Sequence, residues 1–220
     1  MSTARLFTKL GVFVREHFLD ADECAALRAE MRTSPCTAAS VAYPDRPESI
    51  DPGLRKTGLI RVAPPTRAAM VRRLLALKPA IECHFKVALA DVIEPPKFLI
   101  YRDGDYFGPH MDRRAPHPDA APLFSSRRVN MIVYLNGESP TPGPDVYDGA
   151  ALTLYGLIDR PEWRRYGFAI TGRPGLLIAF PSDVVHEVTP IVRGERYNIV
   201  SRFLDAGYQP DTSSARPGGD

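Results

Sequence analysis

Residues 97–112 read KFLIYRDGDYFGPHMD, and the character of the chain changes at this stretch. Before it the pattern favours helices. After it, short β-branched and aromatic runs alternate with turn residues, which is typical of strands. The predicted strands cover residues 98–101, 129–135, 150–155, 176–180, 184–190 and 197–204. Because no helix alternates with these runs, a parallel βαβ sheet is disfavoured, and we predict an antiparallel sandwich or barrel covered by amino-terminal helices.

Three helices are predicted in the first ninety residues. Asp20 and Glu23 form a capping box for a helix over residues 21–31. Thr66 is predicted to cap a second helix, and Pro79 suits the first turn of a third helix over residues 79–89. Three proline-rich segments are predicted mostly as loops, namely 34–65, 113–126 and 136–148.

The 220 residues are 44% hydrophobic and 25% charged, which suits one globular domain with a core that needs no disulfide. We divide this domain into a helical support region (1–96), a β core (97–204) and a flexible tail (205–220). No apolar run reaches the 18 residues of a membrane span. Three cysteines without a CxxC motif are predicted to be free thiols in a reducing cytoplasm: Cys24, Cys36 and Cys83.

The net charge of +2, from 28 basic and 26 acidic residues, is too balanced to indicate a nucleic acid or an anionic membrane as partner. Neighbouring arginines do occur, and we interpret each pair as part of a solvated face. These pairs are Arg72-Arg73, Arg113-Arg114, Arg127-Arg128 and Arg164-Arg165.

Metal-binding residue types gather in the β-rich half. His110 and Asp112 are two residues apart, so on an extended chain they point to the same face and can bind one ion. His186 lies among valines in the run 184–190, where it is either a core residue or a third ligand. Two histidines and one carboxylate on one side of an ion form the facial triad of non-haem Fe(II) oxygenases.

Further candidates lie on the neighbouring predicted strands. Arg196 follows a turn signal ten residues after His186, and we expect the two to lie close together across a hairpin. Its guanidinium can there bind a carboxylate, with Tyr101 contacting the same group. Arg202 shares a strand face with Arg196 and is a candidate contact for a second carboxylate or for the substrate. Three more residues are candidate pocket residues: Asn130, Asn198 and Tyr106.

Three segments resemble the prolyl 4-hydroxylase-like branch of the 2-oxoglutarate/Fe(II) dioxygenases. They are YRDGDYFGPHMD (101–112), RVNMIVYLN (128–136) followed by DGAALTLY (148–155), and PGLLIAFPSDVVHEVTP (174–190) with Arg196 ten residues after His186. Together they cover residues 97–204, about half of the chain, in the order and spacing of that family.

The resemblance implies a double-stranded β-helix, a distorted jelly roll. It also implies that His110, Asp112 and His186 hold Fe(II), while Arg196, helped by Tyr101, binds the distal carboxylate of 2-oxoglutarate. The implied reaction consumes dioxygen, releases succinate and carbon dioxide and hydroxylates an unactivated C–H bond. Ascorbate as a further cofactor stays open. Radical halogenases of the superfamily replace the carboxylate ligand by a small residue, so the presence of Asp112 favours hydroxylation.

Alternatives remain at this point. The substrate is a prolyl or amino-acid-like group, a peptide or another small molecule, and the oligomeric state is open. Residues 196–202, RYNIVSR, also resemble the nucleic-acid dealkylating branch, but the position of Arg196 and the net charge of +2 disfavour that reading. A non-catalytic, cupin-like metal-binding module is disfavoured by the complete triad with Arg196. The segment 113–126 is a candidate active-site lid.

Overall fold

The structure, a computed structural model, describes residues 3–43, 48–113, 115 and 122–209. Its helices are α1 (Thr3–Lys9), α2 (Ala21–Thr33), α3 (Pro64–Leu75), α4 (Lys78–Phe85) and α5 (Pro122–Ser126), with a 3-10 turn at Pro161–Trp163. Its strands are β1 (Phe13–Arg15), β2 (Cys36–Ala38), β3 (Arg55–Lys56), β4 (Gly58–Ile60), β5 (Leu89–Tyr101), β6 (Tyr106–His110), β7 (Arg127–Tyr134), β8 (Gly137–Glu138), β9 (Val146–Gly149), β10 (Leu152–Tyr155), β11 (Gly167–Ile170), β12 (Leu177–Pro181), β13 (His186–Val188), β14 (Ile191–Arg193) and β15 (Arg196–Asp205). In this part of the chain no helix is long and apolar enough to cross a membrane.

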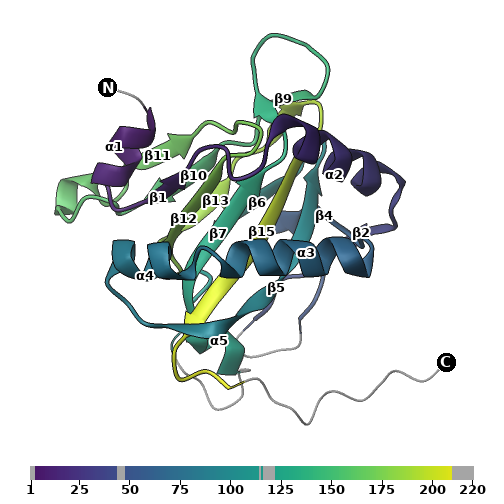
Figure 1. Cartoon of the computed structure of the whole chain (residues 1–220). Coiled ribbons are helices and arrows are strands. Elements are labelled where there is room, and N and C mark those ends of the chain that lie inside the picture. The colour runs from purple at the N-terminus through teal and green to yellow at the C-terminus, as the bar shows by residue number, and fades with distance from the viewer. Residues whose placement is uncertain (1–2, 44–47, 114, 116–121, 210–220) are drawn as a thin grey trace.

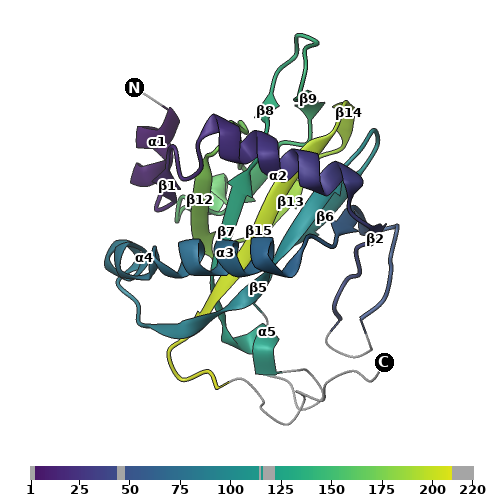
Figure 2. The same ribbon diagram turned by 45° about the vertical axis from the view of Figure 1, so that its right-hand side comes forward.

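Two antiparallel sheets form the double-stranded β-helix (Figures 1 and 2). The major sheet has the order β1-β12-β7-β15-β5-β4-β2, and the minor sheet has the order β11-β10-β13-β6-β3. A small third sheet, β14-β9-β8, contains a parallel pair between β8 and β9. The predicted fold class is therefore confirmed, with helices α2, α3 and α4 across one face of the major sheet (Figure 1).

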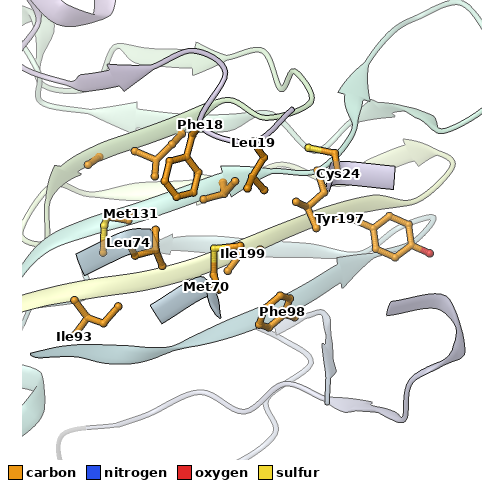
Figure 3. Packing of buried hydrophobic residues seen from close by; sticks show 14 of the residues in the cluster. Phe18, Leu19, Cys24, Met70, Leu74, Ile93, Phe98, Met131, Tyr197 and Ile199 are labelled. Carbon is orange, nitrogen blue, oxygen red and sulfur yellow. The ribbon is translucent and has the colours of Figure 1, made fainter. Parts of the chain in front are cut away.

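The long central strands of the major sheet are covered on both faces, so most of their residues are buried. Along β5, Phe98 and Ile100 pack in the cluster that includes Met70 and Leu74 of α3. Figure 3 shows these helical side chains meeting the strands from one side. Leu99 belongs instead to the cluster between the two sheets. Strand alternation thus assigns every second residue of β5 to the side on which the site lies.

The capping box predicted for α2 is present. The Asp20 carboxylate accepts a hydrogen bond from the Glu23 amide (2.8 Å), and the Glu23 carboxylate accepts one from the Asp20 amide (2.9 Å). The cap predicted for the second helix is wrong, because α3 begins at Pro64 after the N-cap residue Ala63. Proline has a preset φ and no N–H to satisfy, so it starts a helix two residues before Thr66.

The third predicted helix is too long, and the first strand of the β core begins earlier than predicted. Helix α4 ends at Phe85, and β5 runs from Leu89 across Pro95 and Pro96. Its register against β15 shifts between the pairs Val200–Lys97 and Arg202–Glu94. The two prolines lie in this bulge, where a strand tolerates residues that donate no ladder hydrogen bond. The region predicted as helical support therefore contributes eight residues of the β core's longest strand, together with four shorter strands.

The three segments predicted as loops also contain regular structure. Strands β2, β3 and β4 lie in 34–65, β8 and most of β9 lie in 136–148, and α5 lies in 113–126. Such short strands gain their stability from pairing at sheet edges, which a local pattern does not reveal. Half of the candidate lid and most of the tail lie outside the described residues.

Candidate metal centre

The minor sheet brings the two histidines side by side. His110 at the end of β6 and His186 at the start of β13 are direct antiparallel partners. Asp112 follows β6, and its amide donates a hydrogen bond to the Ser182 carbonyl (3.0 Å). One ligand atom from each of His110, Asp112 and His186 lies within 4.8 Å of the others. The structure thus brings together the three residues that the sequence singled out as ligands.

Backbone carbonyls orient both imidazoles. The Nδ1 atom of His110 lies 2.8 Å from the Gly108 carbonyl, and that of His186 lies 3.0 Å from the Val184 carbonyl. With Nδ1 donating to these carbonyls, Nε2 is left to bind a metal ion. Burial and the neighbouring His186 lower the pKa of His110 to about 3, and burial also lowers the pKa of His186. Both rings are therefore neutral, as a metal ligand requires.

Two arginines neutralise the buried carboxylate ligand. Burial by itself favours a protonated Asp112, but the positive charge of Arg202 holds its pKa well below the usual range. Arg202 donates a hydrogen bond from Nη2 to Asp112 Oδ1 at 2.9 Å, and Arg127 Nη1 lies 3.7 Å from the same oxygen. Arg127 also donates two 2.8 Å hydrogen bonds to Glu94. The carboxylate is therefore ionised and fixed in position.

Arg196 lies close to the triad, but not as predicted. Its strand β15 pairs with β5 and β7 in the major sheet, whereas His186 lies in the minor sheet. The predicted hairpin contact is therefore wrong, and the two residues line one cavity because the two sheets face each other. Arg196 and Tyr101 are direct partners, and their side chains line the same cavity as the triad. We call this space the metal-side cavity.

The Arg196 guanidinium is completely buried and incompletely bonded. Its Nη1 donates to the Ala150 carbonyl (2.7 Å), while Nε and Nη2 have no hydrogen-bond partner among the described residues. The rings of Tyr101 and Tyr134 lie 5.3 and 4.9 Å from its central carbon. Leaving a buried charged donor without a partner costs free energy, so a ligand carboxylate suits this position.

The other candidate residues divide into two groups. Asn130, Asn198 and Arg202 line the metal-side cavity, with the Asn130 amide nitrogen and the Asn198 amide oxygen unpartnered in the described structure. Tyr106 is not among the residues that line this cavity. Its hydroxyl donates to the carbonyls of Pro52 (2.8 Å) and Gly53 (3.1 Å), and it therefore anchors a loop.

Sequence reasoning missed several residues of the site. Arg127, interpreted as solvated, is 7% exposed and paired with the buried Glu94. Tyr134 and Tyr147 pack near Arg196, and burial raises the pKa of Tyr134 to about 12. Arg55 lines the metal-side cavity from a segment predicted as loop. One available signal was that Arg127 lies two residues before, and Tyr134 lies near the end of, the strand predicted over residues 129–135.

Taken together, the donor set fits a non-haem Fe(II) site with a 2-oxo acid. Two imidazoles and one carboxylate meet on one side of a shared space, as the facial triad requires. The unpartnered guanidinium of Arg196 lies in the same cavity and matches the second carboxylate of 2-oxoglutarate.

Comparisons with known proteins agree with this geometry. A family model described as the 2OG-Fe(II) oxygenase superfamily matches residues 96–203. A PKHD-type hydroxylase of Teredinibacter turnerae is 30% identical over 109 residues, which are 50% of this chain and 42% of that protein. A PKHD-type hydroxylase of Pseudomonas putida is 29% identical over 111 residues, 50% of this chain and 43% of that protein. The chain thus spans less than half the length of these curated relatives.

Solved structures match over most of the chain. A Pseudomonas putida prolyl-4-hydroxylase is 25% identical with a TM-score of 0.62, covering 88% of this chain and 92% of that one. A prolyl hydroxylase of Trichoplax adhaerens, solved in complex with a hypoxia inducible factor peptide fragment, is 18% identical with a TM-score of 0.62. It covers 92% of this chain and 87% of that one, and at this identity it supports the fold alone.

Proposed function

Because this chain belongs to the 2OG-Fe(II) oxygenase superfamily, we propose that it is an Fe(II)- and 2-oxoglutarate-dependent hydroxylase. One observation carries the proposal. Three metal-ligand side chains with ligand atoms within 4.8 Å share a cavity with a buried guanidinium that has two unpartnered nitrogens. Neither a surface ion pair nor a core histidine would require a cluster of metal-ligand side chains beside a buried, unpartnered guanidinium.

In this proposal His110, Asp112 and His186 hold Fe(II), and Arg196 binds the distal carboxylate of 2-oxoglutarate beside Tyr101. When bound, the iron and its co-substrates supply the oxidative decarboxylation of 2-oxoglutarate to succinate and carbon dioxide, coupled to hydroxylation of a C–H bond. The protein's own contribution is geometric and electrostatic. Neutral imidazoles and an ionised Asp112 present lone pairs, and the buried walls exclude bulk water.

The substrate class follows less directly. A prolyl or amino-acid-like group, in a peptide or a small molecule, is supported by the likeness to a prolyl-4-hydroxylase at 25% identity and to PKHD-type hydroxylases. We further infer that the chain forms one dioxygenase domain, with the helices of the first ninety residues supporting the major sheet. A cytoplasmic location remains a prediction from the three free cysteines.

The first experiment looks for iron-bound 2-oxoglutarate by its visible charge-transfer band. Adding 2-oxoglutarate to the anaerobic Fe(II) protein is expected to produce this band in the wild type. The band should be lost in His110→Ala and Asp112→Ala and should need far more 2-oxoglutarate in Arg196→Met. Folded, iron-loaded wild-type protein without a band would contradict the proposed function and leave a metal-binding jelly roll of another purpose.

A further inference from the structure

Another buried guanidinium, that of Arg55, lies next to the metal centre, on the minor sheet, whereas Arg196 lies on the major sheet. Arg55 on β3 is the antiparallel partner of Phe107 on β6. Its central carbon lies 4.6 Å from the centre of the Phe107 ring, which in turn stacks on His110 with ring centres 3.6 Å apart. Arg55 is thus one aromatic ring away from a proposed iron ligand.

Arg55 lines two adjoining cavities. It contributes to the metal-side cavity, and it also lines a neighbouring cavity together with Val41, Leu54, Phe107 and Leu123. His110 and Asp112 line both spaces as well, so the neighbouring cavity reaches the metal centre. A molecule held there places its atoms beside His110 and Asp112, in a space that Arg196 does not line.

Arg55 has no ion-pair partner in the described part of the chain. The residue is 9% exposed, and its Nη1 donates to the Ser40 carbonyl (3.1 Å) while Nε has no partner among the described residues. Glu48 lines the same cavity, but it is exposed, and its carboxylate accepts a hydrogen bond from the Ser40 hydroxyl (2.6 Å).

Apart from Arg196, the other cations that line these cavities do have acidic partners among the described residues. Arg202 pairs with Asp112 and Glu94, Arg127 pairs with Glu94, and Lys97 lies 3.8 Å from Glu94. Under the proposed function, the two carboxylates of 2-oxoglutarate are taken up by the metal and by Arg196. Among the described cations that line the two cavities, Arg55 then remains without an anionic partner. Burying an unpaired charge costs free energy unless a bound ligand supplies that anion.

We propose that Arg55 binds a carboxylate of the substrate, so that the enzyme hydroxylates a carboxylic acid; this inference rests on the proposed function. A planar guanidinium binds a carboxylate through two parallel hydrogen bonds. One unpaired positive charge is matched by a single negative charge, which favours a carboxylate over a doubly charged phosphate ester. The apolar side chains of Val41, Leu54 and Leu123 suit an aliphatic body attached to that group.

The test compares acids with their carboxamides, which have the same shape but no charge. The anaerobic complex of the protein with Fe(II) and 2-oxoglutarate is titrated with the free L-amino acids, with short peptides bearing a carboxylate, and with the carboxamide of each. Binding is read from the change in the visible band, and turnover from a one-oxygen mass gain in air. Arg55→Gln and Arg55→Lys are compared with wild type and with Arg67→Gln, a control that removes an exposed arginine on α3.

We expect at least one acid to bind about tenfold or more tightly than its carboxamide, as a lost charge-assisted hydrogen bond implies. Arg55→Gln should abolish this preference, Arg55→Lys should keep part of it, and Arg67→Gln should keep all of it. Whether free amino acids or peptides respond identifies the source of the carboxylate. The affinity for 2-oxoglutarate should be the same in Arg55→Gln as in wild type.

Three results would overturn the carboxylate proposal while leaving the proposed function intact. One is a wild-type band that responds equally to acids and carboxamides, or to neither. Another is a weakened affinity for 2-oxoglutarate in Arg55→Gln, which would make Arg55 a co-substrate contact. The third is a lowered unfolding temperature in Arg55→Gln with unchanged acid affinity, which would make its role structural. Absence of the band in wild type would instead contradict the proposed function itself.

Discussion

Four buried charges alternate in sign behind the metal centre: Arg202, Asp112, Arg127 and Glu94. The side chains of Arg127 and Glu94 are 8% and 5% exposed, and they form a bidentate ion pair. Arg202 joins Asp112 to Glu94, with nitrogen–oxygen distances of 2.9 and 3.4 Å. Each charge is acceptable in this dry environment because its neighbours have the opposite sign.

Arg127→Leu is expected to destabilise the protein by about 3–5 kcal/mol, because it leaves Glu94 buried with less compensation. Urea unfolding, followed by far-UV circular dichroism, measures this change. The double variant Glu94→Leu/Arg127→Leu should recover part of the loss, since it removes both charges.

The matched control is Arg67→Leu on the exposed face of α3. A change at such a site is expected to stay within about 0.5 kcal/mol of wild type. If Arg127→Leu were as mild as this control, the charge cluster would not contribute to stability, and Asp112 would need another explanation for its fixed position.

At the scale of the elements, the turn before β12 packs against the distant segment that precedes α2. Gly175 has a φ of +75°, and a Cβ there would lie 2.0 Å from the Leu19 carbonyl oxygen. The Gly175 carbonyl accepts a hydrogen bond from the Phe18 amide (2.9 Å). This close approach seats the segment before α2 against the major sheet, and it leaves no room for a side chain.

Gly175→Ala is therefore expected to cost about 3–5 kcal/mol, at the upper end of single substitutions. Gly11→Ala is the matched control, because Gly11 also has a positive φ (83°) but a Cβ there would meet nothing within 4 Å. The free energy of unfolding of this variant should fall only by the cost of holding alanine in a left-handed backbone conformation, about 1–2 kcal/mol. Equal losses for the two variants in urea unfolding would mean that the contact with Leu19 is not as tight as the structure indicates.

For the molecule as a whole, the site joins residues from both sheets, so binding there stabilises only the folded chain. Metal and 2-oxoglutarate, each at 100 times its dissociation constant, are each expected to add about 2.7 kcal/mol. With Mn(II) in place of Fe(II), thermal unfolding measures both increments. Arg196→Met should keep the metal increment and lose most of the increment from 2-oxoglutarate. Loss of both increments, or retention of both, would contradict the proposed role of Arg196.

Elements with a strong local pattern were predicted well. The helix behind the Asp20–Glu23 cap and the strands around Asn130 and Asn198 are present, because capping and apolar runs act within a few residues. The short edge strands and the start of β5 were missed. Their existence depends on pairing with distant strands, and the bulge at Pro95 and Pro96 depends on the register of β15.

Local spacing in the sequence singled out the pair His110 and Asp112, since residues i and i+2 of an extended chain share a face. His186 and Arg196 were selected by the order and spacing of the family resemblance, because the short-range hairpin expected between them does not exist. Which buried charges surround them required the folded arrangement of the two sheets. Arg202 and Asp112 are 90 residues apart in the chain and meet at 2.9 Å. The environment of Arg55 is set in the same way, by pairing with β6. Burial and charge balance are properties of surfaces brought together from distant segments, and a linear pattern does not contain them.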